Sequence, residues 1–294
     1  MFSAVVGGIA FLLVFYNPIV QYLSRGEPAR LPRTPRPRIN ESLLAIDAAN
    51  ETWSLANCPP DSYAIHILSK APLVIYVENF ISEDERAHLL EISEPLFEPS
   101  TITNDGDSTV RNTSIRNSEV ALIPRTDAVR CVEARAKAFQ GWRDDLWIER
   151  LRTQRYGTDQ HYAHHFDWGS GARGWGRVSS FMVWVRADDD VEGGGTEFPL
   201  LRRDGPDDPW CRWVECPKKR PSKVEVKEQD GTGDDGGEPL TGVTFMPVAG
   251  NAVFWENFRP DGTGRGWEET WHAGLPVKRG TKVGLNIWSW GRLS

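Results

Sequence analysis

Short runs of β-branched and aromatic residues, separated by Gly, Pro and Asp, fill the second half of this 294-residue chain. Runs of this length and composition are typical of β-strands, whereas helices are usually longer and keep an apolar stripe with a helical period. Many short strands between turns favour a β-sandwich or barrel over a helical bundle. From Trp147 onward, the runs are WIERLRTQRY, SSFMVWV, GNAVFW and KVGLNIWSW.

Two helices are expected before these strands. Ser82 and Glu85 have the spacing of a capping box, which predicts a helix from there to about Phe97. Apolar residues at helical spacing predict a second helix over 127–140. We therefore expect a mainly β fold with supporting helices. Upstream of the first helix, PLVIYVENF at 72–80 reads as a first strand, and between the two helices 101–118 reads as a polar loop.

The first 24 residues indicate a membrane anchor. Residues 2–24 carry no charge, and this run is long enough to cross hydrocarbon as a helix, which we expect within residues 3–23. Five arginines at 25–38 would keep the following domain in the cytosol by the positive-inside rule, whereas three glycosylation sequons favour the lumen. We expect a single-pass protein of the endoplasmic reticulum membrane with a lumenal catalytic domain. The expected divisions are an anchor at 1–24, a linker at 25–70 and a domain at 71–294.

The charge of the chain argues against nucleic-acid binding. The net charge is −7 and residues 25–38 contribute +4, so the rest carries −11 and offers no basic face to a duplex. A charged segment rich in Gly and Pro, about 202–241, is expected to be a surface insertion, disordered at least over 218–239. The four cysteines allow two disulfides or four buried thiols, and a zinc site is not expected because no histidine lies near Cys211 and Cys216.

Three separated segments carry the residues of a metal site. His165 and Asp167 are two positions apart, so in a strand both side chains point to the same side. With the distant His272 they make two histidines and one carboxylate, the set that holds non-haem Fe(II) and leaves coordination positions open. Each part alone is a weak signal. Together they predict an oxygenase, with His164 facing away from the metal and His161 at the approach to the strand.

Lys282 is the second element of this site. Alternation along KVGLNIWSW places Lys282, Gly284, Asn286 and Trp288 on one face and apolar residues on the other. A lysine on an inward face is costly unless it has an anionic partner, and a bound dicarboxylate would supply one. Tyr162 could donate a further hydrogen bond to that ligand. The glycines before Thr196, at 193–195, predict a turn where backbone approaches closely.

These segments together resemble the prolyl 4-hydroxylase branch of the Fe(II)/2-oxoglutarate dioxygenases, over roughly residues 72–290 without the insertion. The resemblance implies a double-stranded β-helix (jelly roll), with Fe(II) held by His165, Asp167 and His272. It also implies that Lys282 binds the distal carboxylate of 2-oxoglutarate, helped by Tyr162 and Thr196. The shared motifs are Tyr162-x-x-His165-x-Asp167, Gly193-Gly194-x-Thr196-x-Phe198-Pro199, the strand from Pro247 to Trp255, His272-Ala-Gly-x-Pro-Val277, and the step to Lys282 and Trp288.

The implied activity is hydroxylation of prolyl residues in polypeptides, with O2 and 2-oxoglutarate as co-substrates and L-ascorbate as a cofactor. No side chain need act as a general base. The same chemistry on a small molecule or a non-prolyl residue is one alternative, and a catalytically silent binding module is another. Asp159 stands where the family often has Gly, and the insertion puts the substrate in doubt. The oligomeric state and the disulfide pairing stay open.

Overall fold

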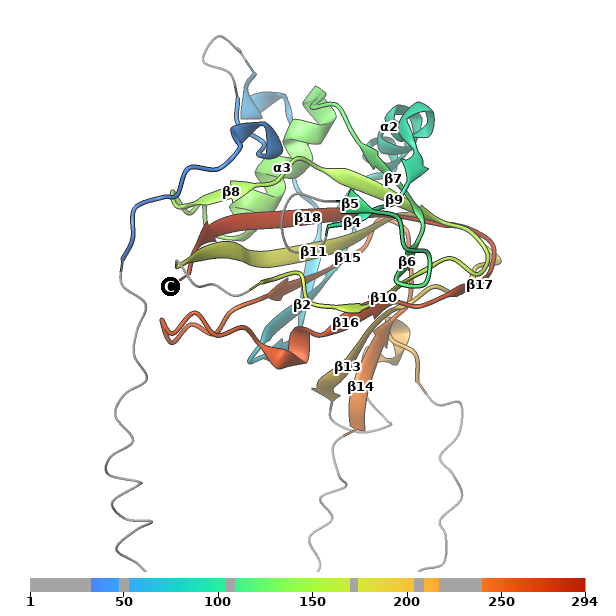
Figure 1. Cartoon of the computed structure of the whole chain (residues 1–294). Coiled ribbons are helices and arrows are strands. Elements are labelled where there is room, and N and C mark those ends of the chain that lie inside the picture. Colours follow the sequence, from blue (N-terminus) through green and yellow to red (C-terminus); the bar gives the residue numbers. More distant parts are fainter. Residues whose placement is uncertain are drawn as a thin grey trace, which may run out of the picture.

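Two antiparallel sheets face each other, and two helices cover the outer side of the larger sheet (Figure 1). The computed structural model describes residues 33–47, 53–103, 109–169, 174–203, 209–216 and 240–293. Strands dominate these residues, so the expected mainly β architecture with supporting helices is confirmed. The arrangement is consistent with a jelly roll.

The larger sheet has nine strands in the order β1-β2-β15-β11-β18-β9-β7-β3, and β8 pairs with the far end of β18. Its centre is the long antiparallel pair of β11 and β18, whose register runs from Trp175 opposite Arg292 to Ala187 opposite Lys282. The strands are β1 (Ala64–Lys70), β2 (Leu73–Glu78), β15 (Ala252–Glu256), β11 (Trp175–Ala187), β18 (Lys282–Arg292), β9 (Arg152–Tyr156), β7 (Glu119–Leu122), β3 (Glu98–Pro99) and β8 (Leu146–Ile148).

The smaller sheet has five strands in the order β14-β13-β16-β10-β6. Two additional pairs, β12 with β17 and β4 with β5, stand apart from both sheets. The five strands are β14 (Leu240–Phe245), β13 (Thr196–Arg203), β16 (His272–Gly274), β10 (His161–His165) and β6 (Arg116–Asn117). The short pairs are β12 (Glu192–Gly193) with β17 (Val277–Arg279), and β4 (Ile102–Thr103) with β5 (Thr109–Val110).

Both expected helices form, as α2 (Glu83–Ser93) and α3 (Asp127–Phe139). The capping box of α2 is present, because the Ser82 hydroxyl accepts from the Glu85 amide and the Glu85 carboxylate accepts from the Ser82 amide. This reciprocal bonding satisfies amides that a helix start leaves without partners. Short 3-10 turns complete the described helical structure: η1 (Glu41–Leu43), η2 (Leu55–Asn57), η3 (Glu94–Leu96), η4 (Pro209–Arg212) and η5 (Glu268–Thr270).

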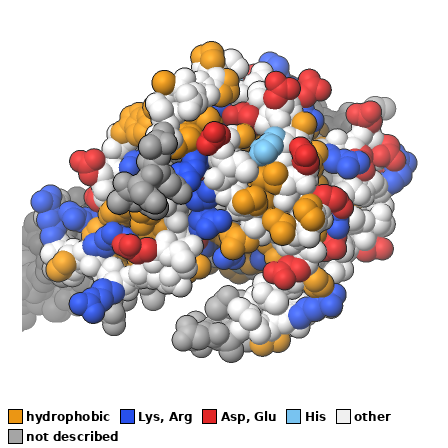
Figure 2. Space-filling view, turned by 90° about the horizontal axis from the view of Figure 1, so that it is seen from above, with side chains coloured by type: hydrophobic (Ala, Val, Ile, Leu, Met, Phe, Trp, Pro, Cys, Tyr) orange, Lys and Arg blue, Asp and Glu red, His pale blue; other side chains and the backbone are white. Residues whose placement is uncertain are grey.

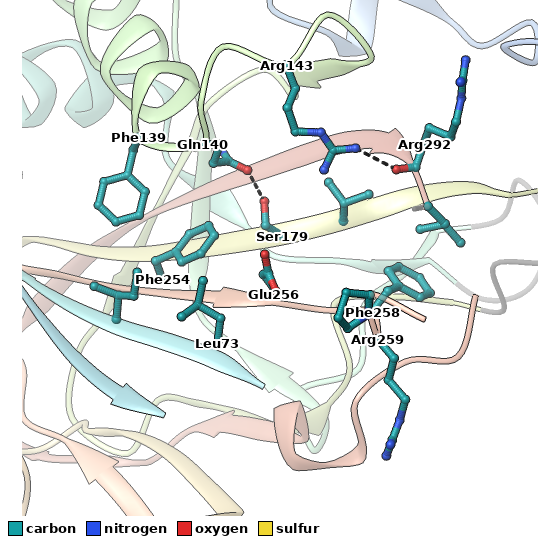
Figure 3. Close-up of a pocket in the computed structure, with 14 residues that line it drawn as sticks. Leu73, Phe139, Gln140, Arg143, Ser179, Phe254, Glu256, Phe258, Arg259 and Arg292 are labelled. Carbon is teal, nitrogen blue, oxygen red and sulfur yellow. Dashed lines mark hydrogen bonds between the residues drawn. The ribbon is translucent and has the colours of Figure 1, made fainter. Parts of the chain in front are cut away.

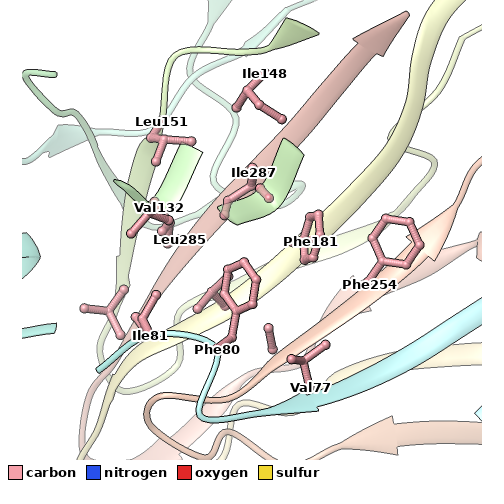
Figure 4. Packing of buried hydrophobic residues seen from close by; sticks show 14 of the residues in the cluster. Val77, Phe80, Ile81, Val132, Ile148, Leu151, Phe181, Phe254, Leu285 and Ile287 are labelled. Atoms are coloured by element: carbon pink, nitrogen blue, oxygen red, sulfur yellow. The ribbon is translucent and has the colours of Figure 1, made fainter. Parts of the chain in front are cut away.

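The larger sheet separates two hydrophobic cores, and β18 contributes to its two sides by alternation. Val283, Leu285 and Ile287 point to the helical side, where they pack with residues of α2, α3 and β11. Figure 4 shows Leu285 and Ile287 among Phe80, Val132 and Phe181 in this core. The predicted alternation of β18 is confirmed, and the face that it turns toward the smaller sheet carries the polar residues of the site described below.

The packed domain begins upstream of residue 71. Strand β1 lies inside the range expected as a linker, and it pairs along its length with β2. Farther upstream, the Ala45 amide donates to the Ile148 carbonyl, at 2.8 Å. A disulfide also joins Cys58 to Cys131 of α3. The expected polar loop over 101–118 likewise contains three short strands, β4, β5 and β6.

The expected surface insertion is partly buried at its start. Trp213 and Val214 are 7% and 1% exposed and pack in the core between the sheets, and Val214 bridges to Phe245 of β14. A disulfide joins Cys211 to Cys216 around them. The expectation that residues 209–216 are an exposed segment is therefore wrong, because Trp213 and Val214 pack beside β14 in the core between the sheets. All four cysteines are in disulfides, so the alternative of four thiols is wrong. Residues 217–239 lie outside the described part.

Within the described residues, no helix combines the length and the apolar character that a membrane crossing requires. The anchor expected within residues 3–23 lies outside the described residues, so it stays a prediction. Surface charge on the described part is mixed, and Figure 2 shows a small group of Lys and Arg side chains near the middle of one face.

Candidate metal centre

His165, Asp167 and His272 come together between the two sheets. His165 ends β10 and His272 begins the neighbouring β16, and the two residues are direct partners in the register. The Nε2 atoms of His165 and His272 lie 3.6 and 3.9 Å from the two carboxylate oxygens of Asp167. One donor atom from each residue lies within 4.8 Å of the others, which is close enough for all three to hold a single ion.

Backbone carbonyls fix the orientation of both imidazole rings. His165 Nδ1 lies 2.9 Å from the Ala163 carbonyl, and His272 Nδ1 lies 2.8 Å from the Thr270 carbonyl. A carbonyl oxygen only accepts, so each Nδ1 carries the proton and each Nε2 keeps a free lone pair. Both lone pairs are therefore on the atoms that face Asp167. This is the usual arrangement of histidines prepared to ligate a metal.

Asp167 is held from two sides by groups of the larger sheet. The Trp288 indole N–H donates to Oδ2 of Asp167 at 2.9 Å, and Arg177 donates to its backbone carbonyl at 2.9 Å. The Arg177 guanidinium also stacks on the Trp288 ring at 3.9 Å and pairs with both oxygens of Glu149. Trp288 is among the residues expected from the sequence, whereas Arg177 and Glu149 are not, because a single charged residue gives no sign of its distant partner.

The electrostatics of the site favour a cation. Burial raises the pKa of Asp167, but the neighbouring His165, His272 and Arg177 together hold that pKa well below its usual value. Burial, and then the proximity of His165, lowers the pKa of His272 to about 4. The site therefore presents an ionised carboxylate and a neutral imidazole, which are the protonation states that a metal ligand needs.

This donor set fits Fe(II). Two imidazole nitrogens and one carboxylate oxygen occupy one side of an ion and leave the other side open. Among the described residues, no other group of His, Cys, Asp and Glu meets the same geometric requirement. The three residues chosen from the sequence are thus the three that the structure brings together.

Lys282 lies in the same cavity and is 1% exposed. Its ammonium donates to the Gly194 carbonyl and lies 4.8 Å from the centre of the Tyr156 ring. Burial lowers the pKa of Lys282 to about 7, and no carboxylate among the described residues pairs with it. The inward position predicted for Lys282 is confirmed. The cavity is lined by Gln154, Tyr156, Tyr162, His165, Asp167, Met182, Thr196, Trp255, His272, Gly274, Lys282 and Asn286.

The glycine turn allows the backbone to approach Lys282. Gly194 has φ of +68°, and a Cβ atom there would lie 3.0 Å from Cγ2 of Val277 and 3.3 Å from Cδ of Lys282. An L side chain at this position is therefore both strained and crowded. The expected close approach at residues 193–195 is confirmed, and it is what lets the Gly194 carbonyl reach the ammonium.

Tyr162 and Thr196 also face the cavity, as predicted. The Tyr162 ring stacks on His165 with centroids 3.8 Å apart, and Thr196 is 4% exposed. His164 points away from the metal residues, and its Nε2 lies 2.8 Å from Oε2 of Glu197. It is therefore outside the site, as expected. Asp159 has φ of +64°, a backbone conformation that glycine adopts without steric strain.

A separate cavity of about 260 Å³ lies on the helical side of the larger sheet (Figure 3). Phe139, Phe254 and Phe258 line it, and Glu256 points into it. Arg143 at its edge is already bonded to Asp145 and to the carbonyl of Arg292. The cavity contains no histidine, and it is not connected to the three metal residues.

Comparison with known proteins agrees with this geometry. The sequence model of the 2OG-Fe(II) oxygenase superfamily matches residues 151–290, which include all three metal residues and Lys282. Residues 151–290 are a domain of the 2OG-Fe(II) oxygenase superfamily. Prolyl 4-hydroxylase 1 of Arabidopsis thaliana is 24% identical over 84% of this chain and 77% of its own length. Prolyl 4-hydroxylase 13 of the same plant is 25% identical over 95% and 88%.

Among solved structures, the viral collagen prolyl hydroxylase of Paramecium Bursaria Chlorella virus-1, in complex with 2OG, is similar to this oxygenase with a TM-score of 0.49. It is 20% identical and covers 74% of this chain and 96% of its own. The Pseudomonas putida prolyl-4-hydroxylase is similar with a TM-score of 0.45 and 16% identity, covering 76% and 94%. The recognition of a prolyl 4-hydroxylase-like oxygenase from the sequence motifs is confirmed by the family match and the plant relatives.

Proposed function

We propose that this oxygenase hydroxylates prolyl residues of polypeptides at C4, using Fe(II), 2-oxoglutarate and O2. The observation that carries the proposal is the common cavity of the two histidines, the aspartate and the buried Lys282. The relatives named prolyl 4-hydroxylase support prolyl residues as the substrate. The net charge of −7 gives no reason to expect a nucleic acid as substrate.

Each residue of the cavity has a definite task in this proposal. His165, Asp167 and His272 hold the metal, and Trp288 and Arg177 keep the aspartate in place. Lys282 binds the distal carboxylate of 2-oxoglutarate, and Tyr162 and Thr196 add hydrogen bonds to that ligand. When bound, Fe(II) with 2-oxoglutarate and O2 would supply the oxidation of an unactivated C–H bond, with one oxygen atom of O2 entering the product and the other entering succinate, which would leave with CO2. The surrounding Trp255, Met182 and Phe198 exclude water from the reacting atoms.

The proposal is tested with proline-rich peptides incubated with Fe(II), 2-oxoglutarate and L-ascorbate. We expect a mass gain of one oxygen atom and 4-hydroxyproline after hydrolysis. The control is His272→Ala, which removes a metal ligand. Turnover of 2-oxoglutarate without any oxidised proline would favour the alternative of a small-molecule or non-prolyl substrate. Absence of both iron binding and turnover would favour a silent binding module.

We also propose that the protein is held in the endoplasmic reticulum membrane by a helix within residues 3–23, with its catalytic domain in the lumen. Two disulfides in the described residues support an oxidising compartment. L-ascorbate is proposed as the reductant that keeps the iron in its ferrous state. Protease protection in sealed microsomes tests the orientation: digestion of the domain without detergent would place it in the cytosol.

A further inference from the structure

Arg152 faces the interior between the sheets, although it was not recognised in the sequence. On β9, Gln154 and Tyr156 line the metal cavity, and Arg152 lies two positions before Gln154 on the same face. The intervening residues face the other way, since Thr153 bonds Ser93 of α2. Arg152 is thus an inward-facing arginine of the central strands.

The register places Arg152 at the end of the cavity that is remote from Lys282. Tyr156 is opposite Lys282, whereas Arg152 is opposite Asn286. Four residues of strand separate the two positions, or about 13 Å. Trp288, which bonds Asp167, lies two residues beyond Asn286 on the same face of β18. Arg152 therefore stands on the metal side, beyond the position proposed for the distal carboxylate of 2-oxoglutarate.

Three guanidinium groups gather at this end, and only one is neutralised. Arg177 pairs with Glu149 at 2.8 and 2.9 Å. Arg116 stacks over the Tyr162 ring at 4.6 Å, and its buried Nε has no hydrogen-bond partner in the described structure. The Arg152 guanidinium has neither an ion pair nor a hydrogen bond to the described residues. Burial lowers the pKa of Arg152, Glu149 opposes this, and the charges of Arg177 and Arg116 add to it.

A partly buried cation without an ion-pair or hydrogen-bond partner costs free energy, which an anionic ligand can recover. Guanidinium groups suit carboxylates in particular, because their N–H groups form paired, charge-assisted hydrogen bonds with both oxygens. The protein as a whole is acidic, so this cationic end is a local property and not a consequence of composition. Because 2-oxoglutarate is proposed to reach toward Lys282, the free cations remain for the other substrate.

We propose that Arg152, together with Arg116, binds a carboxylate side chain of the peptide substrate close to the target residue. The proposal rests on the proposed function, which makes the other substrate a peptide. The enzyme would then prefer prolines that have an acidic residue nearby over prolines in neutral sequences. A C-terminal carboxylate has the same chemistry, so the test separates the two sources.

The test measures the binding of fluorescent proline-rich peptides to the full chain by anisotropy. Three peptides differ in one feature: Glu beside the target proline with an amidated C-terminus, Gln there with an amidated C-terminus, and Gln with a free C-terminal carboxylate. We expect the amidated Glu peptide to bind about tenfold more tightly than the amidated Gln peptide. The Arg152→Gln substitution should reduce this ratio to near one, and Arg152→Lys should retain part of it.

Arg155→Gln is the matched control, because Arg155 lies on the same strand but on its outer face, where it pairs with Glu94 and Glu119. This control should keep the tenfold ratio. Equal binding of all peptides by the wild type would overturn the proposal, as would an equal loss for the Glu and Gln peptides in Arg152→Gln. Preference for the free C-terminus alone would overturn it too.

Hydroxylation of the same peptides distinguishes this proposal from the proposed function. If the Glu peptide still binds more tightly but no proline is oxidised, the proposal of prolyl hydroxylation is refuted and the proposal of a carboxylate subsite stands. Hydroxylation of the Glu and Gln peptides at equal rates and with equal affinities would confirm the function and remove the subsite.

Discussion

The affinity of this enzyme for 2-oxoglutarate should depend on pH through Lys282. Burial lowers the pKa of its ammonium from 10.5 to about 7. That change corresponds to a cost on the order of 5 kcal/mol for keeping the charge inside the cavity. A distal carboxylate offsets the cost, so binding should restore the proton on Lys282.

The direction in which the affinity changes with pH follows from the pKa of Lys282. Below about pH 7, Lys282 is already charged in the free protein, and binding needs no proton uptake. Above it, the affinity for the dicarboxylate should fall about tenfold for each pH unit. Folding stability of the free protein changes in the opposite sense. The penalty of the buried charge is full below about 7 and disappears as pH rises toward 10.5, because the unfolded chain binds more protons in that window.

The assay compares 2-oxoglutarate with 2-oxopentanoate, which lacks the distal carboxylate, by calorimetric titration between about pH 6 and about pH 9. The ratio of the two affinities removes effects of the metal residues, since both ligands chelate alike. Lys282→Met should lower this ratio about a hundredfold or more at neutral pH and make it independent of pH. Lys282→Arg should keep a pH-independent preference. A ratio that is flat with pH in the wild type and unchanged in Lys282→Met would refute the reasoning.

Three further outcomes are expected. His272→Ala should lose bound iron and all turnover, as measured by metal analysis, while its circular dichroism spectrum stays native. Gly194→Ala should raise the Michaelis constant for 2-oxoglutarate and lower the free energy of unfolding by about 1–3 kcal/mol, through its positive φ and crowding. Gly157→Ala, where a Cβ meets only one atom at 4.0 Å, should change neither quantity. Replacing the Cys58–Cys131 disulfide by two alanines should cost about 4 kcal/mol in urea unfolding, because it closes 73 residues; an unchanged midpoint would contradict this.

His165, Asp167 and Lys282 could be predicted because their signals are local, and the distant His272 completes the ligand set. His165 and Asp167 share a face by strand alternation, and Lys282 is a charge in an otherwise apolar run. The ligand chemistry then restricts the function. The capping box of α2 was equally readable, since both partners lie within one turn.

Other features of the fold could not be predicted from the sequence, because they depend on contacts between residues that are distant in the chain. Strand β1 exposes about half of Ile65 and of Ile67, so its apolar residues do not mark a buried face, and only its pairing with β2 defines it. Val214 lies among charged residues, and it is buried because Phe245 is across from it. The ion pair of Arg177 with Glu149 joins β11 to the residue that follows β8, and neither segment gives a sign of the other in the sequence.

Strand β18 determines which of its residues face the cavity and which face the hydrophobic core. Its even-numbered residues present the ammonium at one end and the indole that steadies the aspartate at the other, while its odd-numbered residues fill the opposite core. Inserting or deleting one residue within β18 would exchange these two sets. The lysine would then point into the hydrophobic core, and a valine would point into the cavity. Evolution can therefore vary the surrounding turns in length, but this strand can change only by substitution.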